Sequence, residues 1–305
     1  MLPLIQTAFE LGLVCSLTVL ALFLSYSMLN VCDLSTDGCF TLGAAVGAVV
    51  AISGHPWLSI PAAMAAGVCS GFVTAFLQTR MGIESLLAGI IVNTGLYSIN
   101  IAVMSGASLL NMNKTDTVFT YAREALRHSP LGAQFKLVVA LVAVVLVVAF
   151  LALFLNTRLG LAIRATGNNP DMVRSSSINP VFTTTVGLCV SNAITALSGC
   201  LLGQMQKSMN IDIGSGMVTI ALASLLIGST IVSRGGILPR AISMVVGAIL
   251  FRLVYTVALR FQIPAYMLKL VASLIVMLAI ALPYLKERWP EINRRLAHRS
   301  ERRRD

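Results

Sequence analysis

Residues 157–179 form a polar segment that separates two apolar stretches of the chain. The stretches 137–157 and 175–206 contain no Asp, Glu, Lys or Arg, whereas the polar segment contains three arginines and one acid. Asn169, followed by a proline and an acid, is typical of the start of a helix. Arginine and amide side chains make strong hydrogen bonds to charged groups, so we expect a short helix here that contacts a partner. The residues expected to make this contact are Arg164, Asn168, Asn169, Pro170, Asp171 and Arg174.

A second set of polar residues lies within apolar stretches, where contact with lipid is unfavourable. Asn93 and Asn100 are seven residues apart and therefore lie on nearly the same face of a helix. Such side chains can hydrogen-bond a solute that crosses the membrane, and they can also join neighbouring helices. The residues that we expect to line a solute pathway are Asn93, Asn100, Asn192, Thr195 and Arg252.

Arg252 is the most unusual member of this set. It follows Arg240 by twelve residues, which is about 18 Å along a helix that rises about 1.5 Å per residue. A helix that begins near Arg240 therefore carries Arg252 into the bilayer, unless its long side chain extends to the outer membrane surface. A positively charged lining would attract a solute that bears a carboxylate.

The composition predicts a membrane protein with several spanning helices. Of the 305 residues, 57% are hydrophobic and 11% are charged. An apolar stretch of about 18 residues or more can cross a bilayer as a helix. We expect an all-α polytopic fold of about nine spans, with eight to ten possible. The expected spans are 7–30, 38–53, 57–79, 84–105, 134–156, 180–204, 216–233, 237–259 and 265–284.

The charge distribution predicts how these spans are oriented. Eight of the 22 basic residues lie in the tail 286–305, which we expect to be cytoplasmic because short basic segments stay on that side. Counting spans back from this tail places residues 157–179 in the cytoplasm and residues 106–133 outside. The two shortest spans, 38–53 and 216–233, can each be a re-entrant half-helix. The net charge of +10 thus reflects membrane orientation, and we expect no nucleic-acid partner.

The sequence also contains a faint internal repeat. Residues 33–45 resemble residues 212–223, since each stretch runs from an acid through a glycine into a short apolar segment. The single span 134–156 separates the two units, so the halves 7–105 and 180–284 would have opposite orientations. Inverted repeats with broken helices are typical of transport proteins.

Small residues and cysteines have simpler interpretations. Three pairs of glycines spaced four residues apart permit close contact between helices. These pairs are Gly43/Gly47, Gly67/Gly71 and Gly199/Gly203. The six cysteines are scattered through apolar stretches without the spacing of metal ligands, so we expect neither a metal site nor a cofactor.

Residues 160–179 resemble the cytoplasmic loop of permeases in ABC importers of the branched-chain amino acid and ribose type. The shared pattern is Gly-x-x-x-Arg-Ala-x-Gly-x-Asn, followed by a short helix and an Ile-Asn pair. The chain departs from the family at Ser176 and Ser177, where a small residue and a glycine are usual. Further stretches resemble one branch, the uncharacterised permeases found beside tryptophan- or tyrosine-type binding proteins. These stretches are 33–38, 86–90, 96–100 and 268–270.

The resemblance implies one transmembrane permease domain at 1–285 that works as a pair, most simply as a homodimer in the bacterial inner membrane. It also implies two ATPase subunits in the cytoplasm, which dock on the coupling loop 157–179, and an extracytoplasmic solute-binding protein. The sequence contains no Gly-x-x-x-x-Gly-Lys-Ser/Thr phosphate-binding loop, so we expect ATP to be hydrolysed on a separate subunit and this chain not to be an enzyme. The expected solute is small and polar, with an amino acid favoured.

Two other classes of membrane protein are alternatives to an importer permease. An ion-coupled secondary transporter also uses inverted repeats and broken helices, but it favours an ionisable residue at the centre of its pathway. An intramembrane enzyme would need a catalytic group such as paired carboxylates or a Gly-x-Ser-x-Gly motif, and the sequence offers neither within its spans. The docking loop is the strongest feature and favours the importer.

Overall fold

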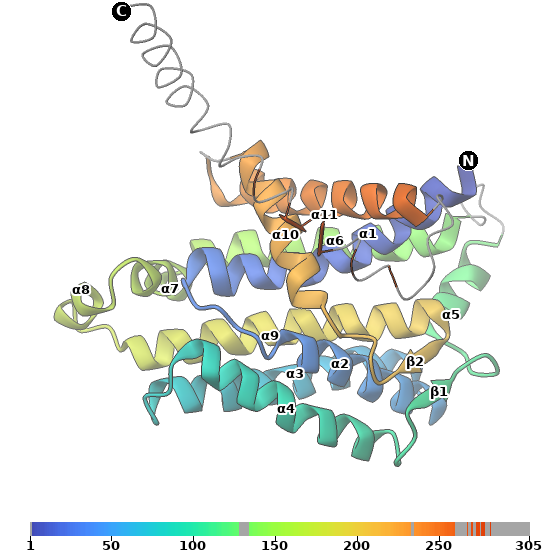
Figure 1. Cartoon of the computed structure of the whole chain (residues 1–305), viewed down its shortest axis with the longest axis horizontal. Helices are drawn as coiled ribbons and strands as arrows, with labels where there is room; N and C mark the ends of the chain where they lie inside the picture. Colours follow the sequence, from blue (N-terminus) through green and yellow to red (C-terminus); the bar gives the residue numbers. More distant parts are fainter. Residues whose placement is uncertain are drawn as a thin grey trace, which may run out of the picture.

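The structure is a computed structural model that describes residues 2–127, 134–232 and 235–259, together with single residues between 267 and 281. Most of the described chain is helical (Figure 1). The first half contains α1 (Leu2–Leu22), the π-helix η1 (Phe23–Met28), α2 (Thr36–Ile52), α3 (Pro56–Thr79), α4 (Ser85–Val103) and α5 (Val118–Ala125). The second half contains α6 (Phe135–Asn156), α7 (Arg158–Asn168), α8 (Pro170–Ser175), α9 (Pro180–Gln206), α10 (Met217–Ile231) and α11 (Ile237–Leu259).

The long helices run along the long axis of the molecule, with α1 and α9 in the middle of the bundle (Figure 1). Six helices of the described chain are long and apolar enough to cross a membrane: α1 with η1, α3, α4, α6, α9 and α11. The prediction of an all-α polytopic membrane protein is therefore confirmed. One short antiparallel strand pair, β1 (Leu109–Asn111) with β2 (Ser208–Asn210), accompanies the helices.

The predicted number of about nine spans is not confirmed. Two of the expected spans are the short apolar helices α2 and α10, which have 17 and 15 residues and fall below the length of a full span. The last expected span, 265–284, lies largely outside the described residues, as does the basic tail 286–305.

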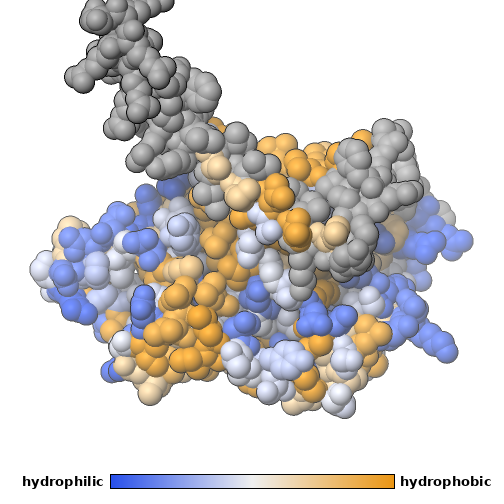
Figure 2. All heavy atoms as spheres, viewed as in Figure 1, coloured by the Kyte–Doolittle hydropathy of each residue, from blue (hydrophilic) through white to orange (hydrophobic). Residues whose placement is uncertain are grey.

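The surface agrees with an orientation in which the long axis is perpendicular to the membrane. Figure 2 shows hydrophilic atoms at both ends of the molecule, where α7 and α8 lie at one end and the region of β1 and α5 at the other. Between these ends Figure 2 shows large hydrophobic areas. Helix α6 illustrates this belt, because large side chains such as Leu146 and Leu153 are more than half exposed.

Close contacts at glycine hold α2 and α3 against α9. A Cβ atom at Gly199 would overlap the carbonyl oxygen of Phe40, and one at Gly43 would overlap the backbone of Ala196. On α3, a Cβ at Gly71 would lie 2.6 Å from the carbonyl oxygen of Leu188. The predicted role of the glycine pairs in helix packing is confirmed at these positions, because only glycine lets the backbones approach this closely.

Helices α2 and α10 begin next to each other inside the bundle. The side chain of Asn192, near the middle of α9, donates a 2.8 Å hydrogen bond to Asp33, so residues 29–35 return from the end of η1 to the centre of the bundle. Helix α2 starts at that depth. The Asp37 carboxylate then accepts hydrogen bonds from the backbone N–H groups of Gly216 (2.9 Å) and Val218 (2.7 Å). Asp37 thereby caps α10 rather than its own helix.

Candidate functional site

The polar segment folds into two short helices, each started by a side-chain cap. Thr157 accepts a hydrogen bond from the backbone N–H of Gly160 at the start of α7. Asn169 accepts two hydrogen bonds of 3.1 Å, from the N–H groups of Asp171 and Met172, at the start of α8. These caps satisfy backbone donors that a helix start otherwise leaves unpaired, so α8 is defined by its own sequence.

The other end of α8 is closed by a Schellman motif. The N–H of Ser177 donates to the carbonyl of Arg174 (3.1 Å), and the N–H of Ile178 donates to that of Val173 (3.2 Å). Ser177 has φ of 60°, in the left-handed region that favours glycine. This backbone conformation explains why the family usually has glycine at this position. Serine here keeps the same helix end, but with some backbone strain.

Substitutions at Ser177 should change stability in opposite directions. Left-handed backbone costs a non-glycine residue about 1–2 kcal/mol, so Ser177→Gly should raise the unfolding temperature of the detergent-purified protein by about 2 °C and Ser177→Val should lower it similarly. Thermal unfolding followed by tryptophan fluorescence measures both. Ser176, with φ of −87°, is the matched control, and Ser176→Gly should bring no gain. Lower stability of Ser177→Gly would contradict this account of the helix end.

The exposed face of α8 is available to a partner, whereas its inner face is anchored. Val173 is buried, while Met172 is 55% exposed. Arg174 and Asp171 form a 3.8 Å ion pair with their side chains 68% and 88% exposed, so it contributes little to folding. Asn168 and Pro170 are exposed too, and Arg164 on α7 is half-buried. The structure thus brings the six predicted contact residues together at one end of the molecule.

Helix α7 fastens this end to the bundle. A Cβ atom at Gly167 would overlap the carbonyl oxygen of Met28, so α7 lies directly against the end of η1. The hydroxyl groups of Thr166 and Thr183 are 2.8 Å apart and link α7 to α9. The polar segment therefore contacts both η1 and α9.

A polar pocket of about 330 Å³ lies where α2, α4 and the start of α10 meet. Figure 2 shows hydrophilic atoms in the lower middle of the visible face, over the region of α4 and the start of α10. The lining residues are Asp37, Gly38, Thr41, Asn93, Thr94, Tyr97, Asn100, Ile211, Asp212 and Ser215. The pocket thus includes two of the predicted pathway residues, the asparagines of α4.

The other three predicted pathway residues lie elsewhere. Asn192 and Thr195 are buried in the bundle, and the bond from Asn192 to Asp33 supports the alternative that this residue joins helices. Arg252 packs between α11 and α1, with 3.5 Å from Nη2 to the Cys15 sulfur and its guanidinium 5.5 Å from the ring centre of Tyr255. None of the three lines the polar pocket.

Several pocket residues were missed in the sequence. Asp37, Asp212, Tyr97 and Thr41 line the pocket but were not among the residues predicted to line a pathway. The available signal was the internal repeat, because the acid of each repeat unit lies at the start of a short helix and the two starts meet. Neither local composition nor helical spacing indicates that meeting.

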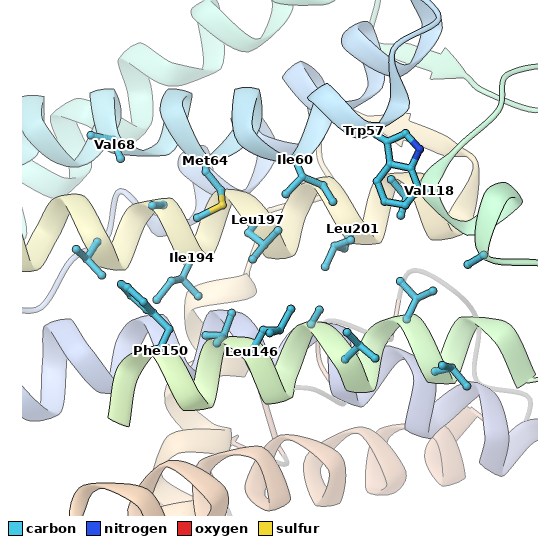
Figure 3. Close-up of a pocket in the computed structure, with 18 of the residues that line it drawn as sticks. Trp57, Ile60, Met64, Val68, Val118, Leu146, Phe150, Ile194, Leu197 and Leu201 are labelled. Atoms are coloured by element: carbon cyan, nitrogen blue, oxygen red, sulfur yellow. The ribbon is translucent and has the colours of Figure 1, made fainter. Parts of the chain in front are cut away.

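A second, larger cavity has different chemistry. It measures about 980 Å³ and lies between α3 and α9 on one side and α6 on the other. Figure 3 shows Ile194, Leu197 and Leu201 on one side and Leu146 and Phe150 on the other. Apart from Trp57 and Thr185, the side chains that line this cavity are apolar, so the polar pocket is the better candidate for a pathway.

Comparison with known proteins gives a family match over residues 5–281, to the family described as "Branched-chain amino acid transport system / permease component". The chain is 28% identical to the tyrosine transport system permease protein of Clostridioides difficile, over 88% of each chain. It is 23% identical to the ribose import permease protein RbsC of Escherichia coli K12, over 84% of this chain and 78% of the relative.

A third relative is the nucleoside ABC transporter permease protein NupB of Lactococcus lactis. It is 26% identical over 62% of this chain and 60% of its own length. No solved structure gives a significant match to the chain.

Proposed function

Because the chain belongs to the permease-component family of branched-chain amino acid transport systems, we propose that it forms the membrane pathway for a small polar solute, in particular an amino acid. As a member of this family it is a multi-pass inner-membrane permease of an ABC importer. In the proposed assembly, two copies of the chain bind two ATPase subunits at the α7–α8 end. A solute-binding protein delivers the solute at the other end, and ATP is hydrolysed only on the ATPase subunits.

The observation that carries this proposal is the form of α8. It is a capped helix whose outer face exposes Asp171, Met172 and Arg174 while Val173 anchors its inner face. A loop that only joined two spans would need neither cap nor anchor. An exposed helix with an apolar side chain between two charged ones suits a groove on a partner protein.

A continuous set of contacts leads from α8 to the polar pocket. Helix α7 contacts Met28 at the end of η1, and the chain then continues through residues 29–35 to α2. Asp33 on this segment is bonded to α9, and Asp37 is bonded to the start of α10. In the proposed mechanism, closure of the ATPase subunits displaces α8, and these contacts transmit the displacement to the pocket.

The π-helix η1 is a suitable place for this displacement to enter the bundle. Its six residues, Phe23–Met28, continue α1 with a wider helical turn. Single π-turns occur frequently at functional sites, where they interrupt regular helical hydrogen bonding. We propose that η1 adjusts as α7 moves, so that α1 itself stays in place.

The solute is proposed from the relatives and from the pocket together. The relatives are named as permeases for tyrosine, ribose and nucleosides, and the tyrosine permease matches over most of both chains. The pocket combines two carboxylates, two amides and an aromatic ring, which suits a small polar molecule with a charged group. An amino acid fits both observations.

The coupling role of α8 is tested by replacing residues 169–171 with Gly-Ser-Gly. We expect normal membrane insertion but loss of solute-stimulated ATP hydrolysis when the permease is reconstituted with the ATPase and binding protein of its operon. Asn169→Asp and Asn169→Ala form a matched pair, because aspartate keeps the cap and alanine removes it at a cost of about 1 kcal/mol. Stimulation that survives the triple replacement would refute the assignment.

The side of the membrane provides an independent check. A cysteine introduced as Ser176→Cys should react with an impermeant maleimide in inside-out vesicles and not in intact cells, because Ser176 is exposed on the segment that we assign to the cytoplasm. Reaction in intact cells would place α8 outside and remove the basis for ATPase docking.

A further inference from the structure

The polar pocket carries negative charge. Two of its lining residues, Asp37 and Asp212, are acids, and the described residues that line it include neither lysine nor arginine. The negative charge of this lining is opposite to the positive lining predicted from Arg252, whose side chain lies against α1 instead. A pocket of this kind attracts cations and repels free carboxylates.

The two carboxylates have different surroundings. Both carboxylate oxygens of Asp37 accept hydrogen bonds from the start of α10, so this residue serves as the cap of that helix. Asp212 is exposed, and its carboxylate accepts no hydrogen bond from the described part of the chain. Asp212 is therefore the acid that is available to a ligand.

The asparagines of α4 supply further unpaired acceptors. Asn100 is 1% exposed, and its amide nitrogen donates to the carbonyl of Gly38 (3.2 Å) while its Oδ1 atom has no partner within the described residues. Asn93 points its Oδ1 atom toward the same helix start, since a Cβ at Gly38 would lie 2.7 Å from it. A buried acceptor without a donor is unfavourable, and a ligand that brings N–H groups would satisfy it.

We propose that this pocket binds the ammonium group of the transported solute. Asp212 provides the opposite charge, Asn93 and Asn100 provide acceptor oxygens, and the 52% exposed ring of Tyr97 provides an aromatic wall. A volume of about 330 Å³ fits a small organic molecule better than a bare ion. The described chain also contains no group of three residues that would hold a metal ion. The identification of the ligand as the transported solute rests on the proposed function.

The charge of the pocket can be measured without knowing the solute. Thr94 lines the pocket and is exposed, so Thr94→Cys should react with methanethiosulfonate reagents in membrane vesicles. At Thr94→Cys, we measure the labelling rate with a cationic reagent divided by the rate with an anionic reagent. We expect this ratio to be about tenfold higher than the same ratio at Ser53→Cys, an exposed position at the far end of α2. The parent chain with its native cysteines gives the background rate.

Asp212→Asn in the Thr94→Cys chain should lower this ratio about threefold. The rate with a neutral methanethiosulfonate should stay constant, which shows that the fold and the access route are intact. A ratio at Thr94→Cys equal to that at Ser53→Cys, or a ratio unchanged by Asp212→Asn at constant neutral rate, would overturn the proposal.

Protection experiments test the ammonium group itself. Tyramine, which has an aromatic ring and an ammonium group, should slow labelling of Thr94→Cys at millimolar concentration. The carboxylate analogue 4-hydroxyphenylpropionate should not, and replacing sodium by potassium should have no effect. Equal protection by both compounds, or protection by sodium alone, would contradict an ammonium site.

These measurements separate the two proposals. They need no ATPase subunit, so a negative pocket with tyramine protection can be found even if the α8 replacement leaves ATP hydrolysis unchanged. In that case the coupling proposal fails and the pocket remains a cation site. Loss of coupling in the α8 variant together with a charge-neutral pocket would instead leave the importer standing and remove the ammonium site.

Discussion

Gly199→Ala is expected to prevent most of the protein from reaching its folded state. The added Cβ atom would overlap the carbonyl oxygen of Phe40, and a carbonyl oxygen on a buried helix cannot turn aside as a flexible side chain can. Helices α2 and α9 would have to separate along their contact, which also includes Gly43 against Ala196. Overpacking of this kind costs about 1–3 kcal/mol or more, and a backbone overlap belongs at the upper end.

The yield of monodisperse protein after detergent extraction measures this effect. Gly95→Ala on α4 is the matched control, because a Cβ atom there meets nothing within 4 Å and alanine favours the helix. We expect at least a fivefold lower yield from Gly199→Ala and an unchanged yield from Gly95→Ala. Equal yields would show that α2 and α9 are less closely packed than the structure indicates.

The second large effect is expected for Asp37→Ala. This change removes the acceptor of two backbone N–H groups, those of Gly216 and Val218, and an unpaired buried donor costs about 1–3 kcal/mol. The start of α10 should then open more often. Asp37→Asn keeps one acceptor oxygen and should have an intermediate effect.

Hydrogen exchange at the first turn of α10 reports this opening directly. We expect the exchange rates of the Gly216 and Val218 amides to rise at least tenfold in Asp37→Ala, following the conversion of about 1.4 kcal/mol to a factor of ten. Asp212→Ala is the control, since this neighbouring acid accepts no bond from α10 and should leave exchange unchanged. Unchanged exchange in Asp37→Ala would mean that other contacts position the start of α10.

The parts of the fold that depend on local pattern were predictable from the sequence. The start of α8 is an example, because Asn169, Pro170 and Asp171 are neighbours in the chain and the cap that they form involves only themselves. The long spans were predictable for a similar reason, since length and hydropathy within one segment decide whether it can cross a bilayer.

The parts that depend on distant residues were not predictable. Asn192 donates a hydrogen bond to Asp33, which lies 159 positions away in the sequence. Asp37 caps α10 across 181 positions at Val218. Arg252 faces α1 because α11 packs there, which no pattern within α11 reveals. Asn93 and Asn100 were correctly predicted to share one face of α4. The residues opposite that face could not be predicted, because they come from α2 and from the chain before α10.

The enclosed position of α2 has a consequence for how the chain is made. Helix α2 packs its glycines against α9, which the ribosome synthesises only after α3 to α8 have emerged. At 17 residues α2 is also short for a stable span of its own. During biosynthesis, the face of α2 that packs against α9 therefore has no partner until α9 has been made. The close contact between α2 and α9 can therefore form only after α9 has been synthesised.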